Sequence, residues 1–263
     1  MSTTETENFG GLKRSNYQAT VDGKKTDLFF LKNSKGHVVA ITNYGGAVVG
    51  VFVPDKNGEL ANVIQSYDSI EAAQKSDSPY KSTLIGRYGN RICEGNFTLN
   101  GKAYHLAVNN GKNHLHGGPG GFECRVWDAR ETTTPEGNPA VAMSYRSADG
   151  EEGYPGNLDI TVTYSLTPDN GLVIDYEATT DAPTIVNPTS HVYYNLHGTT
   201  EHSTDSHLLT IHASGFTPTD AGLIPTGEIL PVEGTPLDFR TPHAIGERIG
   251  QTDYEPLAFG NGY

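Results

Sequence analysis

The clearest pattern along the chain is a regular alternation of apolar and polar residues. From Leu158 to Leu166 the even-numbered residues are apolar, and Asp159, Thr161, Thr163 and Ser165 lie between them. Because successive side chains of a strand point to opposite faces, this period of two predicts an antiparallel strand with one buried side. Residues 167–171 then carry turn-forming residues, and the alternation resumes at Leu172, Ile174 and Tyr176. This region therefore predicts a strand, a turn and a second strand.

Shorter patterns predict further elements on the N-terminal side. Apolar runs predict strands at residues 28–31, 38–42 and 47–53, followed by a short helix at 70–74. In residues 97–106, Asn100-Gly101 separates two alternating segments. This predicts a hairpin, because a type I′ turn needs two residues that tolerate positive φ.

The rhythm of strands and turns, with a spacing of about 8–12 residues, continues to about Phe239. No Ser/Gly linker and no change in composition marks a second domain. We therefore expect one all-β domain over residues 1–263, with residues 1–16 as a flexible tail.

Composition and charge narrow the class of protein. The 31 glycines and 15 prolines fit a turn-rich fold, and a net charge of −13 argues against nucleic acid or an anionic membrane as a partner. The polar, acidic start lacks the features of a signal peptide, and no apolar run reaches transmembrane length. We expect a cytoplasmic protein with Cys93 and Cys124 as reduced thiols, although a single disulfide between them remains an alternative.

Two segments contain histidines in patterns that suggest chemistry. In Asn113–Gly118, an extended backbone would place His114 and His116 on one face. In residues 188–196, a strand would place His191, Tyr193 and Asn195 on one face and Val192, Tyr194 and Leu196 on the other. A mixture of titratable, polar and aromatic groups suits a cleft for a neutral sugar. A surface loop and a solvent-facing polar row are the respective alternatives.

A third segment, residues 86–92, places Arg87 and Arg91 among glycines. An arginine there could clamp substrate oxygens or pair with one of the many carboxylates.

Together with Gly153-Tyr154-Pro155-Gly156 and Tyr164-Ser165-Leu166, these three segments resemble the aldose 1-epimerases, also called galactose mutarotases. The resemblance runs from about Asn43 to the last residue, and it is looser at Gly89 and at residues 188–190. It implies a large antiparallel β-sandwich of the supersandwich type with a sugar cleft on a curved sheet. It also implies that His191 is the general acid, that His116 lies near the ring oxygen, and that Asn90, Arg91 and Tyr193 contact the substrate.

The implied reaction interconverts the α and β anomers of free galactose or glucose by acid/base ring opening, with a monosaccharide as the partner and no cofactor or metal. Histidine suits the acid role because its unperturbed pKa of about 6.5 keeps both protonation states available. The expected assembly is a monomer or a weak homodimer.

The resemblance also implies a departure from the family. Tyr263 matches the tyrosine of a Tyr-Asp-His-Asn motif, whose aspartate binds substrate, and the family's glutamate base would follow later. We therefore expect a truncated sandwich that lacks its last strands and has impaired activity. Glu151, Glu152 or Asp205 could substitute for the base, but each is more simply read as a solvated surface acid.

Three other functions remain open. A non-catalytic sugar-binding protein would keep the cleft without the base. A metal-dependent enzyme of cupin type would use His114, His116, Glu123 and His191 as ligands. A sugar-phosphate epimerase would need a basic cluster, for which only Arg87 and Arg91 are candidates.

Overall fold

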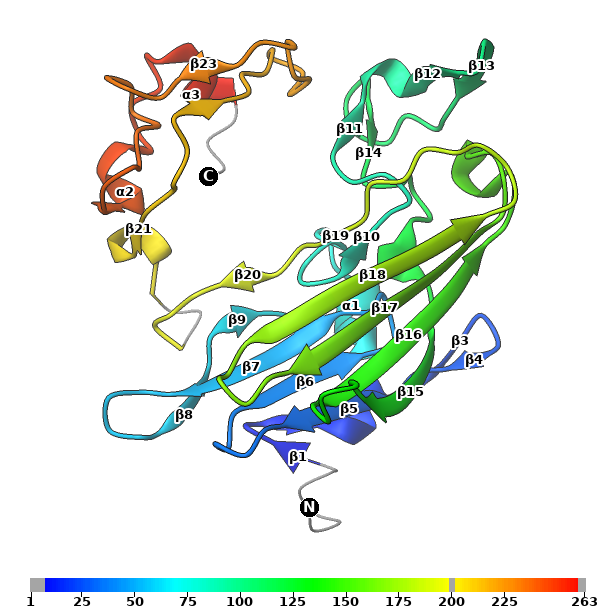
Figure 1. Ribbon diagram of the computed structural model, residues 1–263, viewed down its shortest axis with the longest axis vertical. Coiled ribbons are helices and arrows are strands. Elements are labelled where there is room, and N and C mark those ends of the chain that lie inside the picture. The colour runs from blue at the N-terminus through cyan, green and yellow to red at the C-terminus, as the bar shows by residue number, and fades with distance from the viewer. Residues whose placement is uncertain (1–7, 199–201, 260–263) are drawn as a thin grey trace.

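The computed structural model describes residues 8–198 and 202–259 and has two four-stranded antiparallel sheets packed face to face (Figure 1). The first sheet has the order β5 (Leu28–Lys32), β6 (Val38–Thr42), β7 (Val48–Pro54) and β8 (Leu60–Asn62). The second has the order β15 (Asp128–Thr133), β16 (Pro139–Ser147), β17 (Leu158–Leu166) and β18 (Leu172–Thr180). We call these eight strands the double sheet. The expected all-β antiparallel sandwich is confirmed.

The main core lies between the two sheets. Residues at alternate positions of β17, including Leu158, Ile160, Val162 and Tyr164, are buried there, whereas Asp159 on the opposite face is exposed. The Tyr164 hydroxyl donates a hydrogen bond of 2.6 Å to the Gly46 carbonyl, so its burial leaves no unpaired polar group. The predicted period of two in β17 is confirmed from Leu158 to Tyr164 but not at Ser165, which is buried, and the turn to β18 is confirmed.

The first sheet is also covered on its second face, and this explains the uninterrupted apolar run in β6. The cover comes from β1 (Asn8–Phe9), β2 (Leu12–Lys13), η1 (Arg14–Tyr17) and α1 (Ile70–Gln74). Tyr17 is buried, and the Phe9 ring packs edge-to-face against Phe52 at 5.0 Å. Residues 8–16, expected as part of a flexible tail, thus pack on the first sheet with Phe9 and Leu12 partly buried; residues 1–7 lie outside the described residues.

The Asn-Gly hairpin is present as β12 (Asn96–Leu99) and β13 (Lys102–His105). Asn100 and Gly101 both have positive φ, 51° and 80°, as a type I′ turn requires. The hairpin projects from the body of the molecule (Figure 1).

Three short ladders connect segments that are distant in sequence. They pair β9 (Ile64–Gln65) with β20 (Tyr193–Tyr194), β10 (Leu84–Ile85) with β19 (Thr189–Ser190), and β11 (Arg91–Ile92) with β14 (His114–Leu115). All three are antiparallel and two residues long. They connect the three segments singled out in the sequence.

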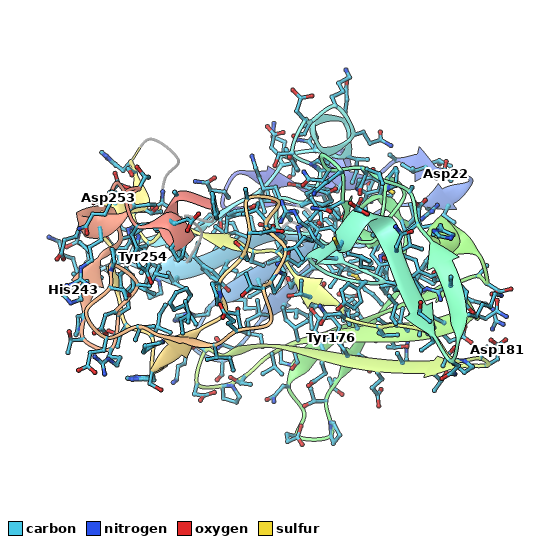
Figure 2. The ribbon with its side chains drawn as sticks, turned by 90° about the horizontal axis from the view of Figure 1, so that it is seen from above. Asp22, Tyr176, Asp181, His243, Asp253 and Tyr254 are labelled. Atoms are coloured by element: carbon cyan, nitrogen blue, oxygen red, sulfur yellow. The ribbon has the colours of Figure 1, made fainter. Side chains whose placement is uncertain are left out.

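Residues 202–259 form an arm beside the double sheet, which we call the C-terminal arm (Figure 1). In Figure 2, His243, Asp253 and Tyr254 of the arm lie at one end of the molecule, and Asp22 and Asp181 lie at the other. The elements of the arm are η5 (Thr204–Ser206), β21 (Leu208–Leu209), β22 (Gly215–Phe216), β23 (Leu230–Pro231), β24 (His243–Ala244), α2 (Ile245–Arg248) and α3 (Glu255–Phe259). Its strands have only two residues each, so the strand rhythm expected up to Phe239 weakens after β18.

The remaining elements are β3 (Thr20–Val21), β4 (Lys24–Lys25), η2 (Cys93–Gly95), η3 (Phe122–Cys124) and η4 (Glu151–Gly153). Within the described residues, no helix has the length and apolar character needed to cross a bilayer.

Candidate functional site

The two histidine segments meet through backbone hydrogen bonds. The His116 N–H donates to the Asn90 carbonyl at 3.0 Å, which continues the ladder between β11 and β14. The His191 N–H donates to the Thr83 carbonyl at 2.9 Å, and the Ser82 N–H donates to the His191 carbonyl at 3.0 Å. Both histidines are therefore held by the segment at residues 82–92.

The side chains form a row of four rings. The His116 and His191 rings are perpendicular, with centroids 5.3 Å apart. Tyr193 lies against His191 at 4.9 Å, and Tyr80 lies against His116 at 4.7 Å. The structure thus brings His116, His191 and Tyr193 together, as the sequence suggested. Tyr80 was missed, because nothing in the pattern around Pro79-Tyr80 distinguishes it from a loop residue.

His116 has a fixed protonation state. Its Nδ1 accepts a hydrogen bond of 3.0 Å from the Asn90 N–H, so the neutral ring carries its hydrogen on Nε2. The pKa of His116 is lowered to about 4, mainly by burial and to a smaller extent by the neighbouring His191 and Arg91. His116 is therefore a neutral hydrogen-bond donor at neutral pH.

The local backbone conformation sets the direction of the His116 side chain. Its φ is +55°, which ends the β14 strand and turns the side chain toward His191. Gly117 follows with a φ of +92°, and a Cβ at that position would lie 1.8 Å from the Gly86 carbonyl oxygen. Only glycine allows this close approach of the two segments.

Asn90 and Arg91 lie beside the histidines. The Arg91 guanidinium donates to Asn110 Oδ1 at 3.1 Å and to Asn90 Oδ1 at 3.2 Å, which fixes the orientation of Arg91. Both residues border a cavity of about 520 Å³ whose other walls come from the C-terminal arm. The apolar part of that wall includes Ile211, Ala213, Phe216, Leu223, Val232, Leu237, Phe239 and Pro256.

His114 has a structural role. It is fully buried, and its Nδ1 donates to the Ala107 carbonyl at 2.7 Å while its Nε2 accepts from the Tyr154 hydroxyl at 2.6 Å. Burial lowers its pKa. The expectation that His114 and His116 share a face is wrong, because the positive φ of His116 ends the strand alternation after Leu115.

Arg87 contacts neither substrate space nor a carboxylate. It is 2% exposed, and its guanidinium donates to the carbonyls of Ser147, Ala148, Pro155 and Gly156 and to the hydroxyls of Ser147 and Thr184. It joins residues 86–92 to the end of the second sheet. Both roles considered for it from the sequence are therefore wrong.

The prediction that residues 191–196 alternate between two faces of a strand is only partly confirmed. The strand β20 contains only Tyr193 and Tyr194, so the alternation does not extend to Asn195. Asn195 is buried, and its amide donates to the His202 carbonyl at 2.9 Å. Tyr194 and Leu196, expected on the apolar face, are exposed.

The nearest buried carboxyl lies behind the site. Glu123 is buried, its Oε2 has no hydrogen-bond partner, and burial raises its pKa to about 8. Glu151 is bound to Arg125 at 3.2 Å and to the Tyr145 hydroxyl at 2.6 Å, so it is a structural ion pair and not a solvated surface acid.

In residues 8–198 and 202–259, no three His, Cys, Asp or Glu side chains gather closely enough to hold a metal ion. The four residues considered for a cupin-type site are thus not assembled into one. Cys93 and Cys124 are both free, as expected from the sequence. Burial raises the pKa of Cys124 to about 11, so that thiol is unreactive at neutral pH.

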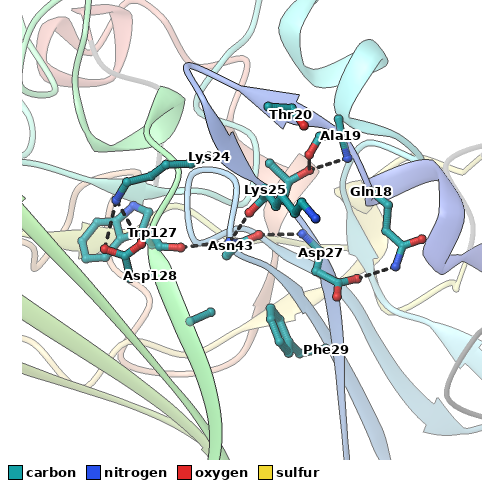
Figure 3. Close-up of a pocket in the computed structure, with 12 residues that line it drawn as sticks. Gln18, Ala19, Thr20, Lys24, Lys25, Asp27, Phe29, Asn43, Trp127 and Asp128 are labelled. Atoms are coloured by element: carbon teal, nitrogen blue, oxygen red, sulfur yellow. Dashed lines mark hydrogen bonds and ion pairs between the residues drawn. The ribbon is translucent and has the colours of Figure 1, made fainter.

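A groove of about 700 Å³ lies elsewhere, where β5 and β15 meet the β3–β4 hairpin (Figure 3). Its polar groups bind one another. Asn43 accepts from the Asp27 N–H at 2.8 Å and donates to the Trp127 carbonyl at 2.9 Å, and Lys24 pairs with Asp128 at 2.9 Å. No histidine lines it.

Comparisons with known proteins identify relatives of this chain. The chain is 42% identical over 213 residues to galactose mutarotase from Sus scrofa, covering 80% of this chain and 60% of that protein. It is 37% identical over 228 residues to aldose 1-epimerase from Escherichia coli K12, covering 87% of this chain and 64% of that protein. The chain thus spans about 60% of the length of these curated relatives.

The fold comparison gives the same result. The crystal structure of galactose 1-epimerase from Lactobacillus acidophilus NCFM superposes with a TM-score of 0.81 and 30% identity, covering 92% of this chain and 69% of that one. A GalM/aldose epimerase homologue from C. elegans superposes with a TM-score of 0.79 and 30% identity, covering 88% of this chain and 68% of that one. The sequence profile described as aldose 1-epimerase matches residues 27–258, and the chain belongs to the aldose 1-epimerase family.

Proposed function

We propose that this chain binds a free aldohexose, galactose or glucose, and interconverts its α and β anomers by acid/base ring opening. The observation that carries the proposal is the pair of perpendicular imidazoles, His116 and His191, 5.3 Å apart beside Asn90 and Arg91. Two titratable rings beside fixed amide and guanidinium groups match a substrate with several hydroxyls.

The two histidines have different roles. His191 donates its proton to the ring oxygen as the bond between C1 and that oxygen breaks, which forms the open-chain aldehyde. His116 cannot take up a proton at Nδ1 without losing the Asn90 N–H, so it acts as a donor through Nε2–H. Rotation about the C1–C2 bond and the reverse proton transfer then give the other anomer.

Three residues hold the sugar in this proposal. Arg91 and Asn90 donate to its hydroxyl groups. Tyr193 is 43% exposed and lies against His191, so its ring can pack on the apolar C–H surface of the sugar.

The proton from the C1 hydroxyl needs an acceptor. The charged groups that act on His116 are His191 and Arg91, and no carboxylate of the described residues is among them. We therefore assign this proton to water, which returns it to the carbonyl oxygen of the open chain when the ring recloses and His191 takes back the proton that it donated. A single well-placed acid contributes roughly 10²–10⁴-fold, and the proposed activity is limited to that contribution.

Polarimetry on freshly dissolved α-D-galactose tests the proposal. We expect the wild-type chain to accelerate mutarotation and His191→Asn to lower the protein-dependent rate by roughly 10²–10⁴-fold. His212→Asn is the matched control, because His212 is an exposed histidine in the C-terminal arm. Equal rates for His191→Asn and wild type would refute the role of His191.

A second candidate is a non-catalytic sugar-binding protein. It is favoured by the same lack of a carboxylate acting on His116 in the described part of the chain. Calorimetry with galactose separates the two functions: binding without any acceleration of mutarotation supports the second candidate, and acceleration excludes it.

We also propose a cytoplasmic location and a monomer or weak homodimer. The two free thiols support a reducing compartment. Light scattering during size-exclusion chromatography measures the assembly, and a stable larger oligomer would contradict this proposal.

A further inference from the structure

Tyr80 contacts His116 directly and is linked to His191 through Thr83. Its ring packs edge-to-face against His116, with centroids 4.7 Å apart and an interplanar angle of 67°. Its carbonyl accepts from the Thr83 N–H at 3.3 Å and from the Thr83 hydroxyl at 3.1 Å. The Thr83 carbonyl in turn accepts from the His191 N–H at 2.9 Å. The turn that carries the Tyr80 ring is therefore linked through Thr83 to the segment that carries His191.

The charged and titratable groups around this contact are few. Arg91, Glu123 and Cys124 act on the Tyr80 hydroxyl, whereas Arg91 and His191 act on His116. Burial raises the pKa of Tyr80, and it also raises the pKa of Glu123 to about 8. Tyr80 and Glu123 are therefore neutral at pH 7, and the positive charge of Arg91 opposes a second positive charge on His116.

The ring contact has a consequence for the tautomer of His116. A neutral imidazole can place its hydrogen on either nitrogen, and in water both tautomers and the cation are accessible. The Asn90 N–H selects the Nε2–H form by occupying Nδ1. That selection depends on keeping water from the ring, because water would stabilise the cation and compete for Nδ1.

We propose that Tyr80 is a positioning residue, whose ring excludes water from one side of His116 and holds it as the Nε2–H tautomer. The role rests on the proposed function, in which this N–H faces a sugar oxygen. Tyr80 itself is not a catalytic residue, since it acts through His116. The ring is required for this role, and the hydroxyl is not.

Nitrogen-15 NMR of the full chain, labelled at histidine, tests the role without requiring activity. In the wild type we expect the His116 nitrogens to show the Nε2–H pattern and to stay neutral down to about pH 5. Tyr80→Leu removes the ring and should raise the pKa of His116 by about one unit or more, with mixed tautomers. Tyr80→Phe keeps the ring and should behave as the wild type does.

Tyr104→Leu is the control, because Tyr104 stacks on Phe97 at 5.0 Å in the β12–β13 hairpin and should leave His116 unchanged. An unchanged tautomer and pKa in Tyr80→Leu would overturn the proposal. If that variant does not fold, nuclear Overhauser contacts between Tyr80 and His116 in the wild type decide it: their absence, or an Nδ1–H tautomer, refutes the role, and their presence with Nε2–H supports it.

The same samples separate this inference from the proposed function. A shift of the His116 pKa in Tyr80→Leu, with a wild type that does not accelerate mutarotation, refutes the activity and leaves the positioning role intact. Mutarotation by the wild type with no spectral change in Tyr80→Leu refutes the positioning role alone.

Discussion

The double sheet and the C-terminal arm are built in contrasting ways. In the double sheet, strands of up to nine residues bury a continuous apolar core that includes Ile41, Val141 and Val162. The arm has two-residue strands, and its buried apolar residues are Val232, Phe239 and Leu257 among those described. Large apolar side chains such as Leu208 and Ile229 are exposed there.

This difference shows where the site derives its rigidity. His116 and His191 are hydrogen-bonded through their backbones to residues 82–92, which are anchored to the double sheet. The arm supplies the apolar wall of the cavity next to Asn90 and Arg91. The reacting groups are thus placed by the well-packed half of the molecule, and the arm shapes the space beside them.

The largest expected effect comes from the anchor between the site and the double sheet. Arg87→Met removes the guanidinium donors to the buried Gly156 and Ser147 carbonyls, and each unsatisfied buried group costs about 1–3 kcal/mol. We expect a loss of at least about 2 kcal/mol in the free energy of unfolding, measured by urea denaturation. Arg146→Met, which removes an exposed ion pair with Asp159, is the control and should cost less than about 1 kcal/mol. Equal losses would mean that Arg87 is no anchor.

A pair of isoleucines compares the two regions directly. Ile41 is fully buried between the sheets, whereas Ile229 in the arm is 77% exposed. Ile41→Ala should lower the free energy of unfolding by about 2–5 kcal/mol through lost burial and a residual cavity. Ile229→Ala should change it by less than about 0.5 kcal/mol. Similar losses at both positions would show that the arm is packed as firmly as the double sheet.

A smaller expected effect is the change of folding stability with pH, which has opposite signs in the two regions. The pKa of Glu123 is raised to about 8, so its contribution to stability is complete below its unfolded value of 4.5 and is lost as the pH rises through about 8. In the arm, a hydrogen bond from Arg240 lowers the pKa of Asp238 to about 2, so its contribution is lost only as the pH falls through that value.

Glu123→Gln therefore should flatten the fall in stability between pH 5 and pH 8, as measured by urea denaturation at several pH values. Glu131→Gln is the control, because Glu131 is exposed and is not among the groups that act on Glu123. A wild-type stability that does not decrease over this range would contradict the buried, neutral Glu123.

The sequence predicted β5, β6, β7, β17 and β18 of the double sheet because these elements are specified locally, whereas β8, β15 and β16 were not predicted. Strand β6 and helix α1 have the predicted bounds, and β17 alternates as its residues do. In each of these segments, the order of apolar and polar residues is enough to identify the side chains that become buried. In residues 188–196 the same argument failed at Asn195, because β20 is only two residues long and its register is set by pairing with Ile64 and Gln65.

The site was predictable only where the family resemblance named residues. The proximity of His116, His191 and Tyr193 agrees with that resemblance. The roles of Arg87 and Tyr80 depend on contacts with residues that are distant or unremarkable in sequence, such as Ser147 for Arg87 and His116 for Tyr80. No spacing or periodicity encodes such contacts, so they required the structure.

The central claim is that His116 and His191 together face a sugar, and titration of the full chain with galactose tests it most directly. Histidine-selective NMR should show the signals of both residues shifting with one common dissociation constant. The signals of His105 on the β12–β13 hairpin and His212 in the arm should stay in place. Galactose binding that leaves His116 and His191 unshifted, or that shifts His105 and His212 equally, would contradict this account of the site.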